Sequence, residues 1–351
     1  MSSYQVICGD ALLELPALIE RGVRVSLVNA DIPYFKVKSD EWDRQWKSEG
    51  EFLQWVDTLC GLLTQILLPN GSLYLYASPQ MARKVGNVVA EHFQILTDIR
   101  WRKPPFSTKA EMFRKEDLRA PFPASETIFF AEQFGAEDAY RAEWMAVKRA
   151  EFGRAGLNNR EVAEAAGCHG AVNHGGSVSN WLLGYNCPTR EQYARLRAEL
   201  GDGFMAREYD DLRALYDASR ADEERGARFA ELRRPFSITA DVPYTDVWDF
   251  PTVLDYPGKH PCEKPPAMMA HIVRASSREG DLVLDLCAGS GVFGEQALAS
   301  GRSVIAIERE ERWARKAQAR ASRYVGGSAV SVRPSARVMP VPPLFALQET
   351  P

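Results

Sequence analysis

Hydrophobic positions along the first hundred residues follow two patterns that alternate. Short apolar runs at 23–29 and 72–77 are rich in β-branched and aromatic side chains, and the segment 51–68 between them repeats its apolar positions every three or four residues. A continuous short run indicates a buried strand, whereas the 3.6-residue period indicates a helix that buries one face. A helix at 81–92 and a strand at 93–101 continue the alternation. This order predicts an α/β domain with a mostly parallel sheet and helices on both faces.

The alternation breaks off near residue 106 and resumes near residue 255. Beyond that point the pattern predicts helix, strand, helix, strand and helix, with a glycine-rich turn after the first strand: 265–277, 282–286, 294–301, 303–308 and 310–324. We therefore expect a split catalytic domain of residues 1–106 and 255–325, interrupted by a mainly helical region of residues 107–254. Residues 326–351 are rich in Pro, Ser and Val, which predicts a loose C-terminal tail.

Composition and charge exclude several classes of protein. The 43 Lys and Arg residues are outnumbered by 47 Asp and Glu residues, so any nucleic-acid surface must be a local basic patch. No apolar run approaches the ~20 residues that a membrane helix needs, and the first residues lack the pattern of a signal peptide. Six scattered cysteines form no disulfide framework, so we expect a soluble cytoplasmic protein with reduced thiols.

A set of cysteines and histidines could be considered as zinc ligands: Cys168, His169, His174 and Cys187. Their spacing matches no standard zinc pattern. Buried thiols and polar loop histidines are the simpler interpretation, and we expect no metal site.

A glycine-rich turn follows the predicted strand at 282–286. Gly289, Gly291 and Gly294 satisfy the spacing G-x-G-x-x-G, in which glycines let a ligand approach the backbone where a helix begins. Three interpretations are open: packing of the helix on the strand, a dinucleotide site such as that of NAD, or a site for S-adenosylmethionine. Asp285 would repel a pyrophosphate but suits the ammonium group of S-adenosylmethionine, which favours the last of them.

Two further motifs follow predicted strands. Glu308 ends the strand after the glycine-rich turn, where a carboxylate can accept hydrogen bonds from both hydroxyls of a ribose. The tetrapeptide Asp31-Ile32-Pro33-Tyr34 follows the strand at 23–29, and ligand sites of open α/β sheets lie at such strand ends. By itself, this tetrapeptide is most often a turn that aspartate starts and proline stiffens.

Together, the tetrapeptide and the glycine-rich turn resemble the motifs of amino-group DNA methyltransferases, which methylate adenine N6 or cytosine N4. Other segments are similar to motifs of the same family: C-G-D-A at 8–11, W-D-R-Q-W at 42–46, L-P-N-G-S at 68–72, W-R-K-P at 101–104 and H-P-C-E-K-P at 260–265. The catalytic motif precedes the target-recognition region and the cofactor motif follows it, which is the order of the family's beta group. The resemblance covers about residues 4–106 and 255–325.

The resemblance implies the Rossmann-like fold of S-adenosylmethionine-dependent methyltransferases, with S-adenosylmethionine as the methyl donor. The residues that it places around this cofactor are Asp10, Lys264, Asp285, Cys287, Gly289, Gly291 and Glu308. In the catalytic loop, the Asp31 carboxylate and the Ile32 carbonyl would accept the two hydrogens of the target amine. Pro33 would stiffen the loop, and the Tyr34 ring would stack on a base that is flipped out of duplex DNA.

The choice of target base is left open by these motifs. Asp31 favours adenine N6, because cytosine-N4 enzymes of the family more often carry serine at that position. Cytosine-N4 methylation is the alternative. A third hypothesis is a DNA-binding regulator that has lost turnover, supported by departures from the family's motifs at Ile32, Leu286-Cys287 and Val292-Phe293. The resemblance also leaves open a homodimer and a restriction endonuclease as partner.

Residues 158–201, within the inserted region, resemble a Cro-like helix-turn-helix. Eight apolar positions can form its core: Val162, Ala165, Ala166, Val178, Trp181, Leu182, Tyr193 and Leu196. Ser177, Ser179 and Asn180 begin the expected recognition helix, where short polar side chains can meet base edges or phosphates. The alternative is a helical lobe that only supports the target-recognition region.

A basic stretch at 100–119 carries seven Lys and Arg residues against three acidic ones. Beside a catalytic cleft, such a stretch suits the phosphate backbone of DNA. Our candidates for these contacts are Lys103, Lys109, Arg114 and Lys115. A solvated face is the alternative.

Overall fold

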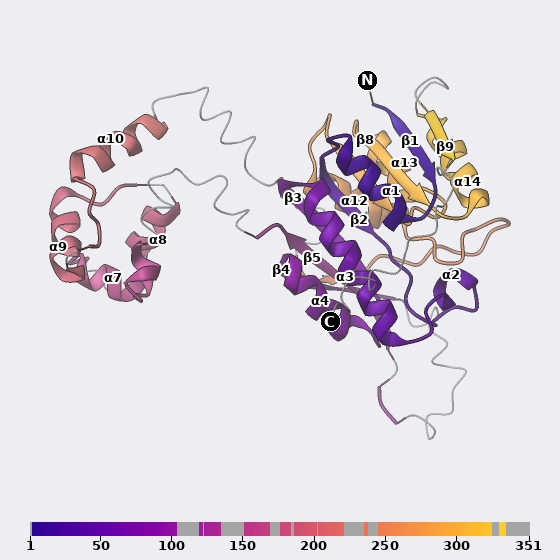
Figure 1. The fold of residues 1–351 in the computed structure, drawn as a ribbon, viewed down its shortest axis with the longest axis horizontal. Helices are drawn as coiled ribbons and strands as arrows, with labels where there is room; N and C mark the ends of the chain where they lie inside the picture. Colours follow the sequence, from indigo (N-terminus) through magenta and orange to yellow (C-terminus); the bar gives the residue numbers. More distant parts are fainter. Residues whose placement is uncertain are drawn as a thin grey trace, which may run out of the picture. The chain divides into compact units, whose positions relative to one another are not determined.

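The computed structural model describes ten stretches of the chain: residues 2–103, 119–121, 123–134, 151–168, 176–183, 186–201, 203–220, 235–237, 245–324 and 330–334. The chain divides into two compact units (Figure 1). The first, which we call the sheet unit, comprises Met1–Phe134 and Pro235–Pro351, and the second, the helical unit, comprises Gly135–Arg234. Each unit is described by itself below.

The sheet unit is built on one large sheet, whose strand order in the described part of the chain is β6-β4-β5-β3-β2-β7-β8-β1-β9. Neighbouring strands run parallel, except that β5 runs antiparallel to both β3 and β4. The strands are β1 (Tyr4–Cys8), β2 (Val25–Ala30), β3 (Leu67–Ala77), β4 (Gln94–Arg102), β5 (Ser125–Glu132), β6 (Val247–Trp248), β7 (Leu282–Leu286), β8 (Ser303–Glu308) and β9 (Val330–Pro334).

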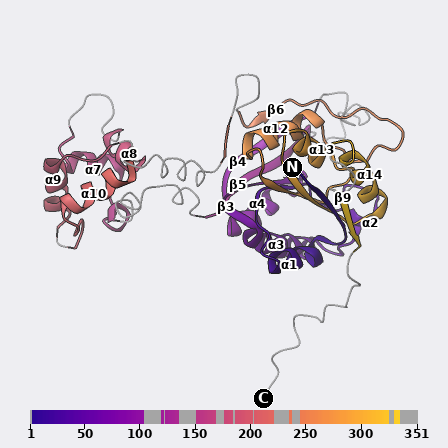
Figure 2. The same cartoon turned by 90° about the horizontal axis from the view of Figure 1, so that it is seen from above.

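Helices cover both faces of this sheet (Figure 2). One hydrophobic core lies between the sheet and α1 (Ala11–Glu20), α3 (Glu49–Ile66) and α4 (Ala82–His92). A second core lies on the opposite face, under α12 (Pro266–Ser276), α13 (Val292–Ala299) and α14 (Glu311–Ala321). Because both faces are covered, β2 is buried at every position, its polar residues Ser26 and Asn29 included. The expected α/β fold with a mostly parallel sheet is confirmed.

The strand order places a crevice between β2 and β7. From β2 the chain continues to β3 on one side, whereas from β7 it continues to β8 on the other side. Ligands of open α/β sheets bind at the carboxyl ends of the strands beside such a reversal. The carboxyl ends of four strands lie side by side there, because β2, β7, β8 and β1 are consecutive neighbours that run in the same direction.

Three strands lie outside the ranges that the sequence analysis assigned to the catalytic domain. Strands β5 and β6 fall within residues 107–254, yet they pair with β4 at one edge of the sheet. The apolar run in β5 is typical of a buried strand, and in the structure all residues of β5 except the first are buried. Strand β9 falls within the tail that we expected to be loose, and its backbone pairs with β1. That expectation is wrong for Val330–Pro334, because a short strand gains its order from the neighbouring strand.

The helical unit contains α7 (Asn159–Ala165), α8 (Gly176–Leu183), α9 (Arg190–Leu200) and α10 (Tyr209–Arg220). Asn158 and Thr189 start α7 and α9 with capping boxes, in which side chain and backbone satisfy each other's hydrogen bonds. Six of the eight expected core positions are buried, and Ala165 and Leu182 pack against them half-buried. Within the described residues of both units, no helix is long and apolar enough to span a bilayer.

Candidate active site

The loop that carries Asp31 and Tyr34 leaves the carboxyl end of β2 and is held by a buried carboxylate. Asp43, in the short helix α2 (Glu41–Arg44), is inaccessible to solvent. Its Oδ1 accepts a hydrogen bond from the backbone N–H of Tyr34 at 2.7 Å, and its Oδ2 accepts one from the backbone N–H of Lys38 at 2.5 Å. Between these two contacts, Phe35 and Lys36 adopt left-handed backbone conformations that are strained for side-chain-bearing residues. Asp43 therefore fixes a loop that would not hold this shape alone.

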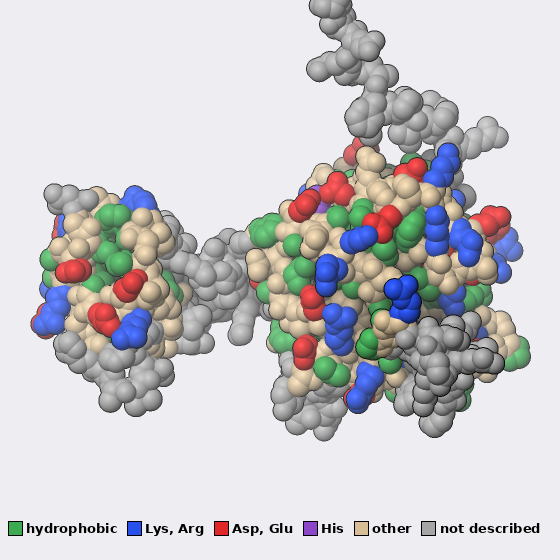
Figure 3. Space-filling model, turned by 90° about the horizontal axis from the view of Figure 1, so that it is seen from below, with side chains coloured by type: hydrophobic (Ala, Val, Ile, Leu, Met, Phe, Trp, Pro, Cys, Tyr) green, Lys and Arg blue, Asp and Glu red, His purple; other side chains and the backbone are tan. Residues whose placement is uncertain are grey.

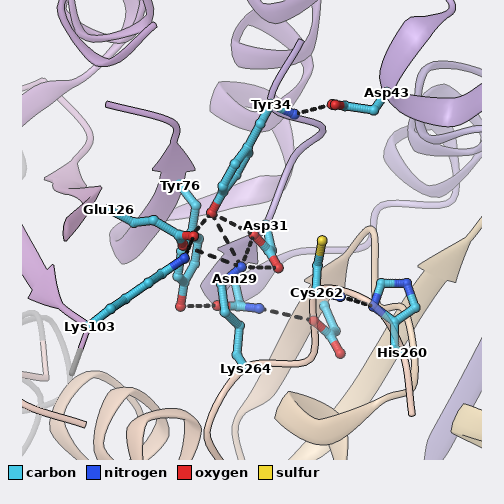
Figure 4. Close-up of polar contacts among 11 residues, drawn as sticks. Asn29, Asp31, Tyr34, Asp43, Tyr76, Lys103, Glu126, His260, Cys262 and Lys264 are labelled. Atoms are coloured by element: carbon cyan, nitrogen blue, oxygen red, sulfur yellow. Dashed lines mark hydrogen bonds and ion pairs between the residues drawn. The ribbon is translucent and has the colours of Figure 1, made fainter. Parts of the chain in front are cut away.

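The Asp31 carboxylate lies against a buried lysine from a distant part of the chain (Figure 4). Lys264 Nζ lies 2.7 Å from both Asp31 Oδ1 and Asp31 Oδ2. The Tyr34 hydroxyl lies 3.3 Å from Oδ1 of the same Asp31 carboxylate. Lys264, which we expected around the cofactor, therefore contacts Asp31, the carboxylate that we expected to be catalytic.

A second carboxylate, Glu126 of β5, completes this cluster and was missed in the sequence. The Tyr34 hydroxyl donates to Glu126 Oε2 at 2.7 Å, and Lys103 Nζ forms an ion pair with Glu126 Oε1. Lys264 Nζ lies 3.7 Å from Glu126 Oε2. A glutamate at the start of an apolar strand was the available signal, but its partners depend on how β5 pairs with its neighbours.

The protonation of this cluster follows from burial and from the balance of two carboxylates with two ammonium groups. Burial raises the pKa of Asp31, and the adjacent Lys264 ammonium opposes that rise. Burial also acts to raise the pKa of Glu126, but Lys264 and Lys103 outweigh it and lower that pKa. Burial disfavours the charged form of Lys264, yet the carboxylates of Asp31 and Glu126 raise its pKa well above the usual range.

A cavity of about 730 Å³ opens at the carboxyl ends of β1, β2, β7 and β8. Asp10, Lys264, Cys287 and Glu308 of the expected cofactor set line it, as do all four residues of the Asp31–Tyr34 loop. The volume lies within the ~300–1,000 Å³ of typical small-molecule sites. The expected catalytic and cofactor motifs therefore border one cavity, although they are far apart in sequence.

Glu308 presents its carboxylate to this cavity with part of its hydrogen-bonding capacity in use. Its Oε2 accepts from the Gly289 backbone N–H at 2.6 Å, and its Oε1 accepts from that of Glu310 at 2.8 Å. A carboxylate offers about four acceptor positions, and backbone groups of Gly289, Arg309 and Glu310 use up to three of them, so acceptor capacity is left for a ligand. Asp10 has a similar arrangement, because its Oδ1 caps α1 by accepting from the Leu12 N–H. These acceptors fit the two hydroxyls of a ribose.

The glycine-rich turn is tightly packed. A Cβ atom on Gly291 would lie 2.6 Å from Cβ of Ala317 in α14, and one on Gly294 would lie 2.4 Å from the Tyr4 ring. These two glycines are therefore required for close packing against α14 and β1, and packing was one of the open interpretations. At Gly289 the nearest side chain is the His260 ring, whose pKa burial lowers to about 4.

Asp285 lies beneath this turn and is not among the described residues that line the cavity. It is almost fully buried, and its Oδ1 accepts a hydrogen bond from Asn29 Nδ2 at 3.1 Å. Its Oδ2 has no hydrogen-bond partner within the described part of the chain. Burial raises the pKa of Asp285 to about 8, so the carboxyl is largely neutral at pH 7. This placement does not match a direct role beside the ammonium group of a cofactor.

The segment before α12 connects the turn to Asp31. Glu263 Oε2 accepts hydrogen bonds from the buried Ser290 hydroxyl in the glycine-rich turn and from Arg320 of α14. The next residue, Lys264, binds Asp31. Adjacent residues of the H-P-C-E-K-P motif thus contact the two halves of the site.

Comparison with known proteins assigns the chain to a family. A sequence model of a DNA methylase family matches residues 25–319. The chain belongs to this family. Its members take the methyl group from S-adenosylmethionine, and the volume of the cavity and the carboxylates of Asp10 and Glu308 that line it fit a nucleoside of that kind.

Individual relatives match over shorter segments. DNA adenine methyltransferase YhdJ of Escherichia coli (strain K12) is 50% identical over 66 residues, which cover 18% of this chain and 22% of that protein. Type II methyltransferase M2.DpnII of Streptococcus pneumoniae is 38% identical over 78 residues, or 21% of this chain and 29% of that protein. The chain therefore matches less than a third of the length of these relatives. The solved M1.HpyAVI–SAM complex is 15% identical with a TM-score of 0.49, covering 91% of this chain and 98% of that one.

The residues expected to bind DNA have different placements in the DNA methylase chain. Lys103 is engaged by Glu126 at the cavity, whereas Lys109, Arg114 and Lys115 lie outside the described residues. In α8, Asn180 is exposed, Ser177 is half-buried, and Ser179 accepts a hydrogen bond from Asn159. On the face of the sheet unit in Figure 3, Lys and Arg side chains are spread out, with acidic side chains among them.

Proposed function

We propose that the protein transfers a methyl group from S-adenosylmethionine to the exocyclic amine of a base in duplex DNA, with adenine N6 as the target. The observation that carries this proposal is that the Asp31–Tyr34 loop and Glu308 border one cavity in a chain of the DNA methylase family. The adenine assignment is supported by aspartate at the first position of the loop and by the 50% identical segment of an adenine methyltransferase.

The residues of the loop have distinct roles in this reaction. An exocyclic amine is a weak nucleophile, because its lone pair is delocalised into the ring. The Asp31 carboxylate and the Ile32 carbonyl accept its two hydrogens, which localises the lone pair on nitrogen. The Tyr34 ring stacks on the base, which must leave the duplex to bring its amine to Asp31. Positioning and preorganised acceptors, rather than a covalent intermediate, account for the rate.

The chemical step balances without a further reactant. S-adenosylmethionine supplies, when bound, a methyl group on a positively charged sulfur. The amine lone pair forms the new N–C bond, and the electrons of the breaking bond remain on sulfur. The nitrogen then carries the positive charge and loses a proton, for which the Asp31 carboxylate is the nearest acceptor on the loop. Glu308 and Asp10 orient the nucleoside end of the donor by accepting hydrogen bonds from it.

We further propose that the helical unit contacts the DNA through the first turns of α8, where Asn180 is exposed. The likeness to a type II methyltransferase supports a restriction-modification setting, in which an endonuclease acts on the same sites.

The decisive experiment is transfer of tritiated methyl groups from S-adenosylmethionine to mixed duplex DNA, followed by nucleoside analysis. Label in N6-methyladenine is expected, and Asp31→Asn should reduce it at least about a hundredfold while S-adenosylmethionine still binds. Label in N4-methylcytosine would favour the cytosine alternative. Binding of cofactor and DNA without any transfer would favour a regulator that has lost turnover.

A further inference from the structure

Lys264 is a buried lysine that the reaction described above does not use. Its side chain is 8% exposed, and it carries its charge into the site from a segment 233 residues away from Asp31. Burial of an ammonium group is costly unless carboxylates compensate it. Two carboxylates do so here, since Nζ lies 2.7 Å from both oxygens of Asp31 and 3.7 Å from Glu126 Oε2.

The hydrogen bonds around Asp31 leave room for a substrate amine. An ionised carboxylate offers about four acceptor positions, two on each oxygen. Lys264 occupies one position on each oxygen. The Tyr34 hydroxyl has one hydrogen, and the shorter of its two contacts, 2.7 Å against 3.3 Å, directs that hydrogen to Glu126 rather than to Asp31. Asp31 thus keeps acceptor capacity for the target amine, provided that it is ionised.

The ionisation of Asp31 depends on Lys264. Burial and the like charge of Glu126 both raise the pKa of Asp31, and the Lys264 ammonium is the group that opposes them. Lys103 pairs with the other carboxylate of the cluster, Glu126. The titratable groups that face Asp31 besides Lys264 are Tyr34, Tyr76, Glu126, Cys262, Asp285 and Cys287.

The backbone around Lys264 is anchored on both sides. Before it, Glu263 is held by Ser290 and by Arg320, whose guanidinium lies 2.9 Å from the Glu263 carboxylate. After it, Pro265 is the N-cap of α12, so the chain enters a helix at once. An anchored backbone lets a long side chain hold a fixed geometry at a smaller entropic cost.

We propose that Lys264 is a positioning residue: its ammonium group keeps the Asp31 carboxylate ionised and oriented toward the target amine. This inference rests on the proposed methyl transfer. It differs from the expectation from sequence, in which Lys264 contacts the cofactor.

The test compares Lys264→Met with the wild-type protein in pH profiles of kcat, at saturating DNA and S-adenosylmethionine. A nearby opposite charge shifts a carboxyl pKa by about 1–3 units, so the acidic limb should move up by that amount when the ammonium is removed. On the acidic side of the limb, kcat of the variant should fall about tenfold for each unit of that shift, and it should recover as pH rises past the shifted limb. Affinity for S-adenosylmethionine, measured by calorimetry, should stay within about threefold.

Two further variants decide the case if Lys264→Met folds poorly. Lys264→Arg keeps the positive charge and should keep the limb at the wild-type pH. Glu126→Gln removes the like charge beside Asp31 and should move the limb to lower pH, the opposite direction. The matched control is Lys84→Met, which removes an exposed lysine paired with Glu49 on the surface and should leave the profile unchanged.

The outcomes separate the two proposals. No label transferred by the wild-type protein would overturn the proposed function itself. An active wild-type protein with parallel profiles for Lys264→Met would overturn only the role of Lys264, and a loss of cofactor affinity in that variant would restore the expectation from sequence. The role of Lys264 would also be overturned if the acidic limb moves in Lys264→Arg. The same holds if the limb does not move to lower pH in Glu126→Gln.

Discussion

Asp285 makes stability depend on pH in a way that the structure allows to be worked out. The carboxyl is buried beneath the glycine-rich turn, with Asn29 as the partner of one oxygen and none within the described residues for the other. The perturbation is Asp285→Asn, which mimics the neutral acid in size and in having one acceptor oxygen. It removes the group that must ionise as pH rises.

The sign and size follow from linkage between protonation and folding. Burial, opposed in part by the Asn29 hydrogen bond, raises the pKa of Asp285 from 3.8 to about 8. Between these values the folded protein holds a proton that the unfolded chain has lost, so stability is full below pH 4 and falls as pH rises through 8. The free energy of unfolding changes by about 1.4 kcal/mol per pH unit in this range. Asp285 should therefore lower it by on the order of 4 kcal/mol between pH 5 and 8.

Urea unfolding of both proteins at pH 5, 6, 7 and 8 measures this effect. The free energy of unfolding of the Asp285→Asn variant, relative to that of the wild-type protein, should rise by on the order of 4 kcal/mol between pH 5 and 8. Asp281→Asn, four residues before Asp285 in the sequence and outside the Asn29 contact, sets the background for exchanging a carboxylate for an amide. If the difference in free energy of unfolding between the two proteins stays constant from pH 5 to 8, Asp285 is ionised in the folded protein. That result would refute the argument from burial.

Three other predictions address the cavity, the catalytic loop and the helical unit. Glu308→Gln should lower the affinity for S-adenosylmethionine, measured by calorimetry, about tenfold or more, because one charged acceptor is lost. The control Glu311→Gln, at an exposed position, should leave the affinity unchanged. Equal affinities of the Glu308 variant and the wild type would place the ribose elsewhere. Asp43→Asn sets a donor against a backbone N–H and should lower the free energy of unfolding by about 1–3 kcal/mol and reduce kcat; a variant with wild-type stability and rate would contradict its role in holding the loop. Alanine at both Ser179 and Asn180 should lower methylation of the preferred DNA sequence toward that of scrambled DNA, as expected for loss of about 1–3 kcal/mol of base discrimination; unchanged selectivity and salt dependence would mean that the unit is only a support.

Local patterns determined the elements of the sheet unit closely. The strands expected at 282–286 and 303–308 have those bounds in β7 and β8, and the helix expected at 51–68 is shifted by only two residues in α3. These elements are set by apolar period and by turn residues, which are properties of neighbouring positions. The same local signals placed Asp31 and Glu308 at strand ends, and parallel strands then bring such ends to one edge.

Long-range pairing determined what local patterns do not contain. Strand β9 was taken for a loose tail, because its order comes from pairing with β1 and not from its own composition. Strand β5 was included in the inserted region, although its apolar run was visible, since no local signal says which sheet a strand joins. Boundaries between domains depend on contacts that only the folded chain defines.

The chemistry of the site shows the same division between sequence and tertiary structure. The sequence predicted the Asp31–Tyr34 loop, the glycine-rich turn and Glu308 as parts of a site, because each lies at the end of a predicted strand and the first two resemble short family motifs. Only the tertiary structure showed that Lys264 belongs to Asp31, and that Asp285 is buried beneath the turn and away from the cavity. The physical reason is that a period or motif reports which positions are buried or polar. Which buried charges meet is decided by strand order and register, and that meeting sets the protonation on which the proposed reaction depends.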